Sequence, residues 1–446
     1  MTKPETKRAL VVGLGLTGLS CVRHLAGRGY AVTVVDTRAQ PPKLDELERE
    51  FPRVPVHLGG LPAALFDDPG LLVVSPGVSV KESPIARAIE RGAQAIGDIE
   101  LFAREATAPV IAVTGANGKS TVTALTGEMC RQGGLRTAVG GNIGVPALEL
   151  LAGSEPEVYV LELSSFQLET TWSLNARAAA VLNITPDHMD RYRNIDGYAA
   201  AKARIFRGNG TMVLNADDHL VMRMRDSGRR TVSFSLSRPL EAQDYGLDEI
   251  VGETWLVRGK QPLMRAREVS LAGRHNLANV LAAMALAEAA GVSVDAARAA
   301  VRGFKGLKHR TELVAERDNV RWYDDSKGTN VGATVAALNG MTAPVILIAG
   351  GDGKGQDFSE LRPACVLHAR AVVLIGRDAP LIEAALGGSV PVHRAPDMHN
   401  AVRRAAGLAQ PGDVVLLSPA CASFDMFRNY EHRAEVFRAA VQEVVA

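Results

Sequence analysis

Short apolar runs alternate with helix-like patterns along the whole chain, and this alternation limits the fold more than any other feature. The runs at residues 9–12, 31–35 and 71–75 are too short for helices and rich in valine, which is typical of buried strands. Runs at residues 231–236 and 254–257 lie in a more polar region and predict a hairpin. Further strand-like runs occupy residues 158–163, 178–184, 212–215, 320–323, 345–349, 372–375 and 414–417. The pattern predicts an α/β protein with parallel sheets.

Chain length and two polar, glycine-bearing stretches divide the chain into three segments. With 446 residues, the chain is too long for one hydrophobic core. Polar, glycine-bearing stretches near residues 97 and 303–308 predict domains over residues 1–97, 98–305 and 306–446. We expect a Rossmann-like N-terminal domain, a central P-loop ATPase-type parallel sheet and a Rossmann-like C-terminal domain.

Composition excludes several functional classes. The 50 basic and 49 acidic residues nearly balance, so no basic field indicates nucleic acid. The most apolar long stretch, residues 277–292, contains Asn279 and Glu288 and is too short to cross a bilayer. Residues 1–8 are polar and show no signal-peptide pattern. Four cysteines without Cys-x-x-C spacing are typical of buried thiols in a reducing compartment, so we expect a cytoplasmic protein.

Residues 110–121 read VIAVTGANGKST, an apolar strand that runs into a glycine-rich turn, a lysine and two hydroxyls. Gly115 and Gly118 allow backbone N–H groups to surround an oxyanion, and a helix from Lys119 to about residue 131 directs its positive end toward it. The lysine would reach the terminal phosphates, and one of the hydroxyls that follow would bind Mg²⁺. The alternative is an ordinary strand–turn–helix junction. The motif predicts a site for a nucleoside triphosphate.

A second glycine motif follows the first apolar run. Gly13, Gly15 and Gly18 form G-x-G-x-x-G, and Asp36 ends the next run about twenty residues later. On this pattern alone, a nicotinamide-dependent dehydrogenase is one interpretation. The same geometry binds other nucleotide diphosphates, including a UDP-sugar, and Arg38 adds a cation that suits phosphate. A glycine turn without a ligand also stays open.

Three ionisable residues in the central segment point to metal or phosphate chemistry. Glu162 lies near the end of an apolar run, where a carboxylate needs a cation, either Mg²⁺ or a helix lysine. His188 lies among aspartates after another run, although Mg²⁺ prefers oxygen ligands. Lys202 shares an apolar helix face with Tyr198 and Ile205. Its amine either extends to solvent or is desolvated, with a low pKa that would allow it to add CO₂ and become a carbamate.

Several polar clusters remain. Asn142 occupies a glycine-rich turn, where it either contacts phosphate or stabilises the turn. In the third segment, clusters at residues 324–330, 350–354 and 418–424 each follow a predicted strand. Because the carboxyl ends of parallel strands meet at one edge of a sheet, we expect these clusters to surround one crevice. Its lysines suit an anionic substrate.

Taken together, these motifs resemble the Mur ligase family over essentially the whole chain. The resemblance is carried by residues 13–20, 114–121, 161–168, 187–192, 273–276, 279, 309–310, 325–330, 350–354 and 418–430. Departures at Ala116, Arg193, Gly328 and Ala434 remove no charged or ligating group. The resemblance implies an ATP-dependent amide ligase of peptidoglycan precursor synthesis, which adds D-glutamate to UDP-N-acetylmuramoyl-L-alanine through an acyl phosphate. We expect a monomer.

The resemblance also implies roles for single residues. The catalytic residues would be Lys119, Glu162, His188, Lys202 and Lys327. Two magnesium ions would be held by Ser120, Thr121, Glu162, His188 and Lys202, the last as a carbamate. ATP would be held by Gly115, Ala116, Asn117, Gly118, Lys119, Ser120, Thr121, Asn276, Asn279, His309, Arg310, Asp325 and Lys327.

The two other substrates are assigned in the same way. The UDP-sugar would contact Leu16, Thr17, Asp36, Thr37, Arg38, Gly77, Asn142 and Gln167. D-glutamate would contact Thr329, Lys354, Ser423, Phe424 and Tyr430. A dehydrogenase would leave the phosphate loop unexplained. A nucleotide-binding module without turnover would not need Glu162, His188 and Lys202, and a folate polyglutamylase would not need the N-terminal fingerprint.

Overall fold

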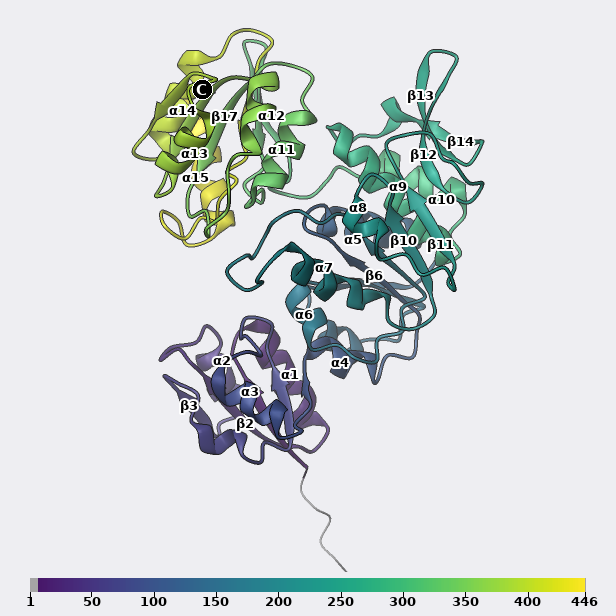
Figure 1. Cartoon of the computed structure of the whole chain (residues 1–446), viewed down its shortest axis with the longest axis vertical. Coiled ribbons are helices and arrows are strands. Elements are labelled where there is room, and N and C mark those ends of the chain that lie inside the picture. Colours follow the sequence, from purple (N-terminus) through teal and green to yellow (C-terminus); the bar gives the residue numbers. More distant parts are fainter. Residues whose placement is uncertain (1–6, 446) are drawn as a thin grey trace, which may run out of the picture.

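The computed structural model describes residues 7–445 and contains three sheets that follow one another along the chain (Figure 1). The predicted α/β class is confirmed, with one sheet in each of the three predicted segments. The exact boundaries near residues 97 and 305 stay a prediction. Most of the polar N-terminal stretch, residues 1–6, lies outside the described residues.

The N-terminal sheet has five parallel strands in the order β3-β2-β1-β4-β5. Its elements are β1 (Arg8–Val12), α1 (Leu16–Gly27), β2 (Ala31–Asp36), α2 (Leu44–Glu50), β3 (Val56–Leu58), η1 (Ala63–Phe66), β4 (Leu71–Val74), α3 (Ser83–Glu90) and β5 (Ala95–Ile96). A Cβ on Gly18 would lie 1.9 Å from the carbonyl oxygen of Gly13, so only glycine lets α1 pack this closely on the turn after β1.

The central sheet has nine strands in the order β14-β13-β12-β11-β10-β9-β6-β8-β7. Its strands are β6 (Val110–Thr114), β7 (Thr137–Gly141), β8 (Val158–Glu162), β9 (Ala178–Val181), β10 (Thr211–Asn215), β11 (Thr231–Phe234), β12 (Tyr245–Ile250), β13 (Glu253–Arg258) and β14 (Gln261–Arg265). Its helices are α4 (Asp98–Ala103), α5 (Lys119–Gln132), η2 (Ala147–Ala152), α6 (Ser165–Glu169), α7 (Ile195–Ala203), η3 (Arg204–Phe206), α8 (His219–Met222), η4 (Ala266–Glu268), α9 (Arg274–Ala289) and α10 (Val294–Gly303). The phosphate-loop helix α5 begins where the motif predicts.

The hairpin predicted between residues 231–236 and 254–257 is wrong. β11 runs parallel to β10, whereas β13 forms an antiparallel hairpin with β12, which was not predicted. The turn of that hairpin contains Val251 and Gly252, which have φ values of 52° and 75°. Two positive φ values are typical of the tight turns that join twisted strands, but valine is a rare residue there, so the sequence carried little turn signal.

The C-terminal sheet has six strands in the order β15-β16-β20-β17-β18-β19, and only β15 is antiparallel to its neighbour. Its elements are β15 (Glu312–Arg317), β16 (Val320–Asp324), α11 (Val331–Asn339), β17 (Val345–Gly350), α12 (Leu361–His368), β18 (Ala369–Ile375), α13 (Ala379–Leu386), β19 (Val392–Arg394), α14 (Met398–Leu408), β20 (Val414–Leu417) and α15 (Tyr430–Val445). The carboxyl ends of β16, β17 and β20 carry the three polar clusters.

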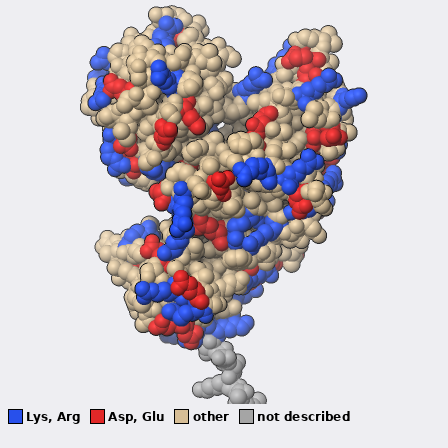
Figure 2. Space-filling view, viewed as in Figure 1, with Lys and Arg blue, Asp and Glu red and all other residues tan. Residues whose placement is uncertain are grey.

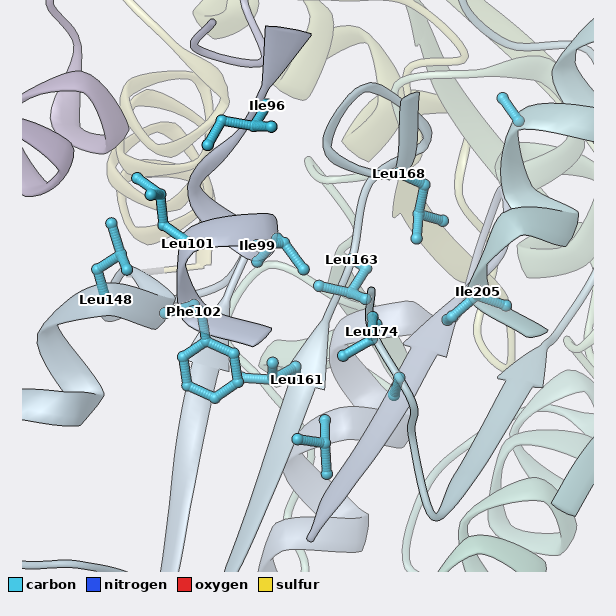
Figure 3. Packing of buried hydrophobic residues seen from close by; sticks show 14 of the residues in the cluster. Ile96, Ile99, Leu101, Phe102, Leu148, Leu161, Leu163, Leu168, Leu174 and Ile205 are labelled. Carbon is cyan, nitrogen blue, oxygen red and sulfur yellow. The ribbon is translucent and has the colours of Figure 1, made fainter. Parts of the chain in front are cut away.

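The N-terminal and central domains share one hydrophobic core. Buried residues from both form a single apolar cluster, and α4 lies at the junction. Figure 3 shows Ile99 and Phe102 of α4 directed toward Leu161 and Leu163 of the central domain. By contrast, the buried clusters of the C-terminal sheet contain only residues from position 314 onward. Among the described residues, the C-terminal domain therefore has a core of its own.

The surface matches the balanced composition. On the face shown in Figure 2, basic and acidic side chains are interspersed and neither sign forms an extended field. Across residues 7–445, no helix combines the length and the apolar character needed to cross a membrane.

Candidate active site

The phosphate loop joins β6 to α5 at the carboxyl edge of the central sheet. Gly118 has a φ of 84°, and a Cβ there would lie 2.5 Å from Oδ1 of Asn279. Lys119 donates hydrogen bonds of 2.9 Å to the carbonyl oxygens of Gly115 and Ala116. Burial lowers the pKa of Lys119 from its usual value. The loop thus encloses its own lysine beside the positive end of α5, which is a suitable arrangement for polyphosphate.

A cavity of about 260 Å³ opens between this loop and the C-terminal domain. Its lining includes eight residues predicted to bind ATP, namely Asn117, Gly118, Thr121, Asn276, Asn279, Arg310, Asp325 and Lys327. The buried Ser120 does not line it but accepts a 2.7 Å hydrogen bond from Arg310 of the C-terminal domain. The cavity is therefore assembled from two domains.

The same cavity has walls that the sequence analysis missed. Leu182 and Phe234 supply apolar surface that suits a flat base, and Asn183, Asn215 and Asp217 add polar groups. Asn215 ends β10, so the rule that ligands bind at strand carboxyl ends could have identified it. Phe234 ends β11, which carried the mistaken hairpin prediction.

Two ionisable residues of this cavity have strongly altered pKa values. Burial raises the pKa of Asp325 to about 7, although Ser418 donates a 2.7 Å hydrogen bond to its Oδ2. Burial and the nearby Arg310 lower the pKa of Lys327 to about 8. The Lys327 ammonium lies 3.7 Å from the ring centroid of Tyr430. Groups with such values are typical of functional sites.

His309 is turned away from the cavity. It has a φ of 62°, and its Nδ1 lies 2.7 Å from Oδ2 of the buried Asp324. Glu312 completes a group of three potential metal ligands. Arg438 forms ion pairs with both carboxylates of this group and so supplies its cation. This cluster is therefore an internal ion network.

Glu162 ends β8 with its carboxylate buried. Its Oε1 accepts a 2.7 Å hydrogen bond from Asn142, and its Oε2 has no hydrogen-bond partner among the described residues. The helix-lysine alternative is not observed, because within residues 7–445 neither carboxylate oxygen of Glu162 contacts a lysine. A buried carboxylate oxygen without a partner is costly, and a divalent cation would satisfy it.

His188 lies on the loop that follows β9. It has a φ of 56°, and its imidazole lies 4.7 Å from the ring centroid of Phe166. Burial lowers the pKa of His188, which favours the neutral imidazole that metals bind.

Lys202 lies on α7 directly behind the phosphate loop and is only 1% exposed. Its Nζ donates a 2.8 Å hydrogen bond to the carbonyl oxygen of Gly115 and lies 3.4 Å from Oγ1 of Thr114. Burial, reinforced by Lys119, lowers the pKa of Lys202 well below its usual value. The alternative that this lysine extends to solvent is wrong, and a neutral amine is favoured.

A second cavity, of about 440 Å³, opens between the N-terminal and central domains. All eight residues predicted for the UDP-sugar line it: Leu16, Thr17, Asp36, Thr37, Arg38, Gly77, Asn142 and Gln167. The buried Asp36 is already engaged, since it accepts hydrogen bonds from the backbone of Leu14 and from Arg38. Burial raises the pKa of Asp36, but these hydrogen bonds outweigh it and hold the pKa below its usual value.

The residues predicted for D-glutamate are less closely gathered. Lys354, with a φ of 52°, forms a 3.2 Å ion pair with Asp187 of the central domain. Ser423 is buried and Phe424 is 74% exposed. Together with Thr329 and Tyr430, they follow strands of the C-terminal sheet but line neither of the two cavities.

Arg191 is a residue that the sequence analysis missed. Its guanidinium donates to the carbonyl oxygens of Pro76 and Val78 in the N-terminal domain. It also pairs with Glu169 at 2.6 Å and lies 4.1 Å from the ring centroid of Phe166. Arg191 thereby ties the edge of the second cavity to the loop that bears His188. An arginine in a charged loop gave no local signal of this contact.

Comparisons with known proteins cover nearly the whole chain. Three domain families match it: "Mur ligase MurD-like, N-terminal domain" at residues 7–97, "Mur ligase middle domain" at 113–287 and "Mur ligase, glutamate ligase domain" at 309–421. The UDP-N-acetylmuramoylalanine–D-glutamate ligase of Nitrosococcus oceani is 54% identical, with 98% of this chain and 97% of the relative covered. The enzyme of the same name from Methylobacillus flagellatus is also 54% identical, with 100% and 98% covered.

Solved structures show the same fold at lower identity. The UDP-N-acetylmuramate–alanine ligase of Thermotoga maritima aligns with a TM-score of 0.60 and 19% identity, covering 99% of this chain and 100% of that one. A pseudomurein peptide ligase from Methanothermus fervidus aligns with a TM-score of 0.61 and 17% identity, covering 98% and 100%.

Proposed function

The chain belongs to the Mur ligase family, and we propose that it joins D-glutamate to UDP-N-acetylmuramoyl-L-alanine at the expense of ATP. One observation carries this assignment. Asn142 lines the cavity of the N-terminal domain and donates a 2.7 Å hydrogen bond to Glu162 beside the phosphate loop. A substrate that extends from the UDP cavity therefore brings its far end toward the phosphates of ATP.

An amide does not form usefully from a free carboxylate in water, so the carboxylate must first be activated. The γ-phosphoryl group of ATP moves to the alanyl carboxylate, which gives an acyl phosphate and ADP. The amine of D-glutamate then attacks the acyl carbon, and the tetrahedral intermediate expels phosphate and loses a proton. Lys119 and the amides of the phosphate loop stabilise the charge on the transferring group, and Lys327 adds a cation from the C-terminal domain.

The donor set at the phosphate loop fits magnesium. Glu162 and His188, with the hydroxyls of Ser120 and Thr121, would hold it, and the unpartnered Oε2 of Glu162 supports this. When bound, Mg²⁺ neutralises charge on the phosphoryl oxygens. We assign two ions to this region.

Lys202 is proposed to bind the second ion as a carbamate. Its low pKa makes the neutral amine available, and addition of CO₂ with loss of a proton would convert a buried base into an anionic oxygen ligand. The position of its Nζ, 2.8 Å from the Gly115 carbonyl, would direct that ligand to the phosphate loop.

The remaining assignments concern the substrate sites, the oligomeric state and the cellular compartment. The UDP-sugar is assigned to the cavity that contains the glycine fingerprint, and D-glutamate to the region around Lys354 and Ser423. The protein would act as a monomer, since one chain supplies both cavities. The four free, buried cysteines suit the reducing cytoplasm.

The test is Mg²⁺-dependent phosphate release from ATP in the presence of UDP-N-acetylmuramoyl-L-alanine. Release that requires D-glutamate and is not supported by L-glutamate is expected. The Lys119→Ala variant should release no phosphate, because the phosphates of bound ATP would lose the lysine cation that contacts them. Release with neither isomer would reject D-glutamate as the added amino acid, and wild-type turnover in Lys119→Ala would reject the phosphate loop as the ATP site.

A further inference from the structure

Two asparagines that lie 213 residues apart in the sequence face each other across the junction of the central and C-terminal domains. Asn117 of the phosphate loop donates from Nδ2 to Oδ1 of Asn330 at 3.2 Å. Asn330 donates in return from Nδ2 to Oδ1 of Asn117 at 3.1 Å. The two amides thus form a reciprocal pair.

All hydrogen-bonding groups of the Asn330 side chain are used. Besides the amide pair, its Oδ1 accepts a 2.8 Å hydrogen bond from the backbone of Ala333 and caps α11. Its Nδ2 also donates to Oδ2 of Asp187 at 3.2 Å. The side chain is 3% exposed. Rotating the amide would place its oxygen against the Asp187 carboxylate, so only one orientation satisfies every partner.

Both partners of Asn330 belong to loops that surround the phosphates. The backbone of Asn117 is fixed by Asn183, whose side chain accepts from its N–H at 2.8 Å and donates to its carbonyl oxygen at 3.0 Å. Asp187 directly precedes His188, and its Oδ1 forms an ion pair with Nζ of Lys354 at 3.2 Å. Asn330 therefore contacts the phosphate loop and the His188 loop at once.

The start of α11 is built for close approach to the central domain. A Cβ on Gly332 would lie 2.7 Å from Oγ1 of Thr185, so glycine is needed where the two domains meet. The C-terminal domain shares no buried apolar cluster with the rest of the described chain. Directional polar contacts, which include the amide pair and the hydrogen bond from Arg310 to Ser120, therefore hold it on the phosphate loop.

We propose that Asn330 is a positioning residue that docks the C-terminal domain on the phosphate loop through Asn117. In this docked arrangement Lys327 reaches the ATP cavity and Lys354 reaches the His188 loop. The inference rests on the proposed function, because those lysines act on its substrates. It assigns to Asn330 a role beyond capping α11.

Asn330→Asp separates docking from capping. Aspartate caps helices as well as asparagine does, so α11 should keep its stability. The variant loses both N–H donors and sets a second carboxylate against Asp187. We expect kcat/KM for D-glutamate to fall by about tenfold or more and the apparent KM for ATP to rise. The dissociation constant for UDP-N-acetylmuramoyl-L-alanine should not change, because its cavity is lined only by residues between positions 13 and 167.

A matched control is Asp397→Asn, which exchanges the same two side chains at the cap of α14 in the same domain. It should leave all constants at wild-type values. In the double variant Asn330→Asp/Asp187→Asn, an amide donor again faces a carboxylate. Its activity should therefore exceed the product of the two single effects.

The docking inference fails if Asn330→Asp keeps kcat/KM for D-glutamate within about twofold of wild type. It also fails if the variant melts earlier and loses affinity for all three substrates alike, which would indicate a structural role. Small-angle scattering with an ATP analogue provides a readout without turnover, and the variant should stay more extended than wild type. If wild-type protein compacts with the analogue but shows no D-glutamate-dependent phosphate release, the proposed function fails and the docking role stands.

Discussion

The Nζ nitrogen of Lys202 lies 2.8 Å from the carbonyl oxygen of Gly115, the first glycine of the phosphate loop. This lysine is desolvated, and within residues 7–445 only neutral polar atoms lie within hydrogen-bonding distance of it. Among the described residues, a charged amine there would have no counter-ion in direct contact, which favours the neutral form. This relationship makes Lys202 the most informative single residue for mutation.

Lys202→Ala should lose activity by about 100-fold or more, because the proposed carbamate, an anionic ligand of the phosphate site, could no longer form. Added acetate or formate should restore part of the activity by placing a carboxylate in the space left by the side chain. Phosphate release with and without the acid measures both effects. The exposed Lys260, changed to Ala, serves as control. Full activity of Lys202→Ala without any acid would refute the carbamate.

The pKa of Lys327 predicts an alkaline limit for ATP binding. Burial lowers this pKa to about 8, so the side chain is charged below that pH and neutral above it. The apparent KM for ATP should rise by up to about tenfold per pH unit on the alkaline side. Lys327→Arg keeps its charge and should move the rise to higher pH. An identical profile in both proteins would show that another group sets the limit.

Arg191→Met should lower the affinity of the protein for UDP-N-acetylmuramoyl-L-alanine. The variant releases the carbonyl oxygens of Pro76 and Val78, which flank Gly77 in the second cavity. We expect the dissociation constant of UDP-N-acetylmuramoyl-L-alanine, measured by calorimetry, to rise by about tenfold. Arg193→Met, an exposed neighbour in the same loop, should have no effect. Equal affinities of the two variants for UDP-N-acetylmuramoyl-L-alanine would contradict the role of Arg191 in joining the two domains.

Arg433→Met should destabilise the C-terminal domain. Arg433 is fully buried, makes no ion pair among the described residues and donates three hydrogen bonds to Ser326 and Cys421. Its loss would leave those acceptors unsatisfied, at a cost of about 3 kcal/mol in the free energy of unfolding. Urea denaturation followed by circular dichroism measures this cost, and the exposed Arg428→Met is the control. A midpoint shift equal to that of the control would contradict the prediction.

Much of the architecture follows from local patterns. Strand-length apolar runs and glycines at their carboxyl ends predicted the α/β class, the start of α5 and the polar edges of the sheets. The family resemblance, and not these local patterns, grouped Asn142 with the fingerprint residues, and they line a single cavity. These features depend on neighbours in the sequence, so a single chain reveals them.

The rest depends on how the domains meet. Asn330 and Arg191 act through partners more than 100 residues away, and nothing in their local sequence distinguishes them from a helix cap and a surface arginine. His309 resembles an ATP-binding residue, yet its imidazole faces Asp324. The roles of the site residues stay predictions until they are tested by mutation.

The apolar cluster shared by the N-terminal and central domains has a consequence for how the chain comes apart. Because α4 packs inside this shared cluster, unfolding of either domain would expose part of the apolar core of the other. Calorimetry should therefore resolve two unfolding transitions, one for the joined pair and one for the C-terminal domain. The three sheets are thus expected to unfold as two cooperative units.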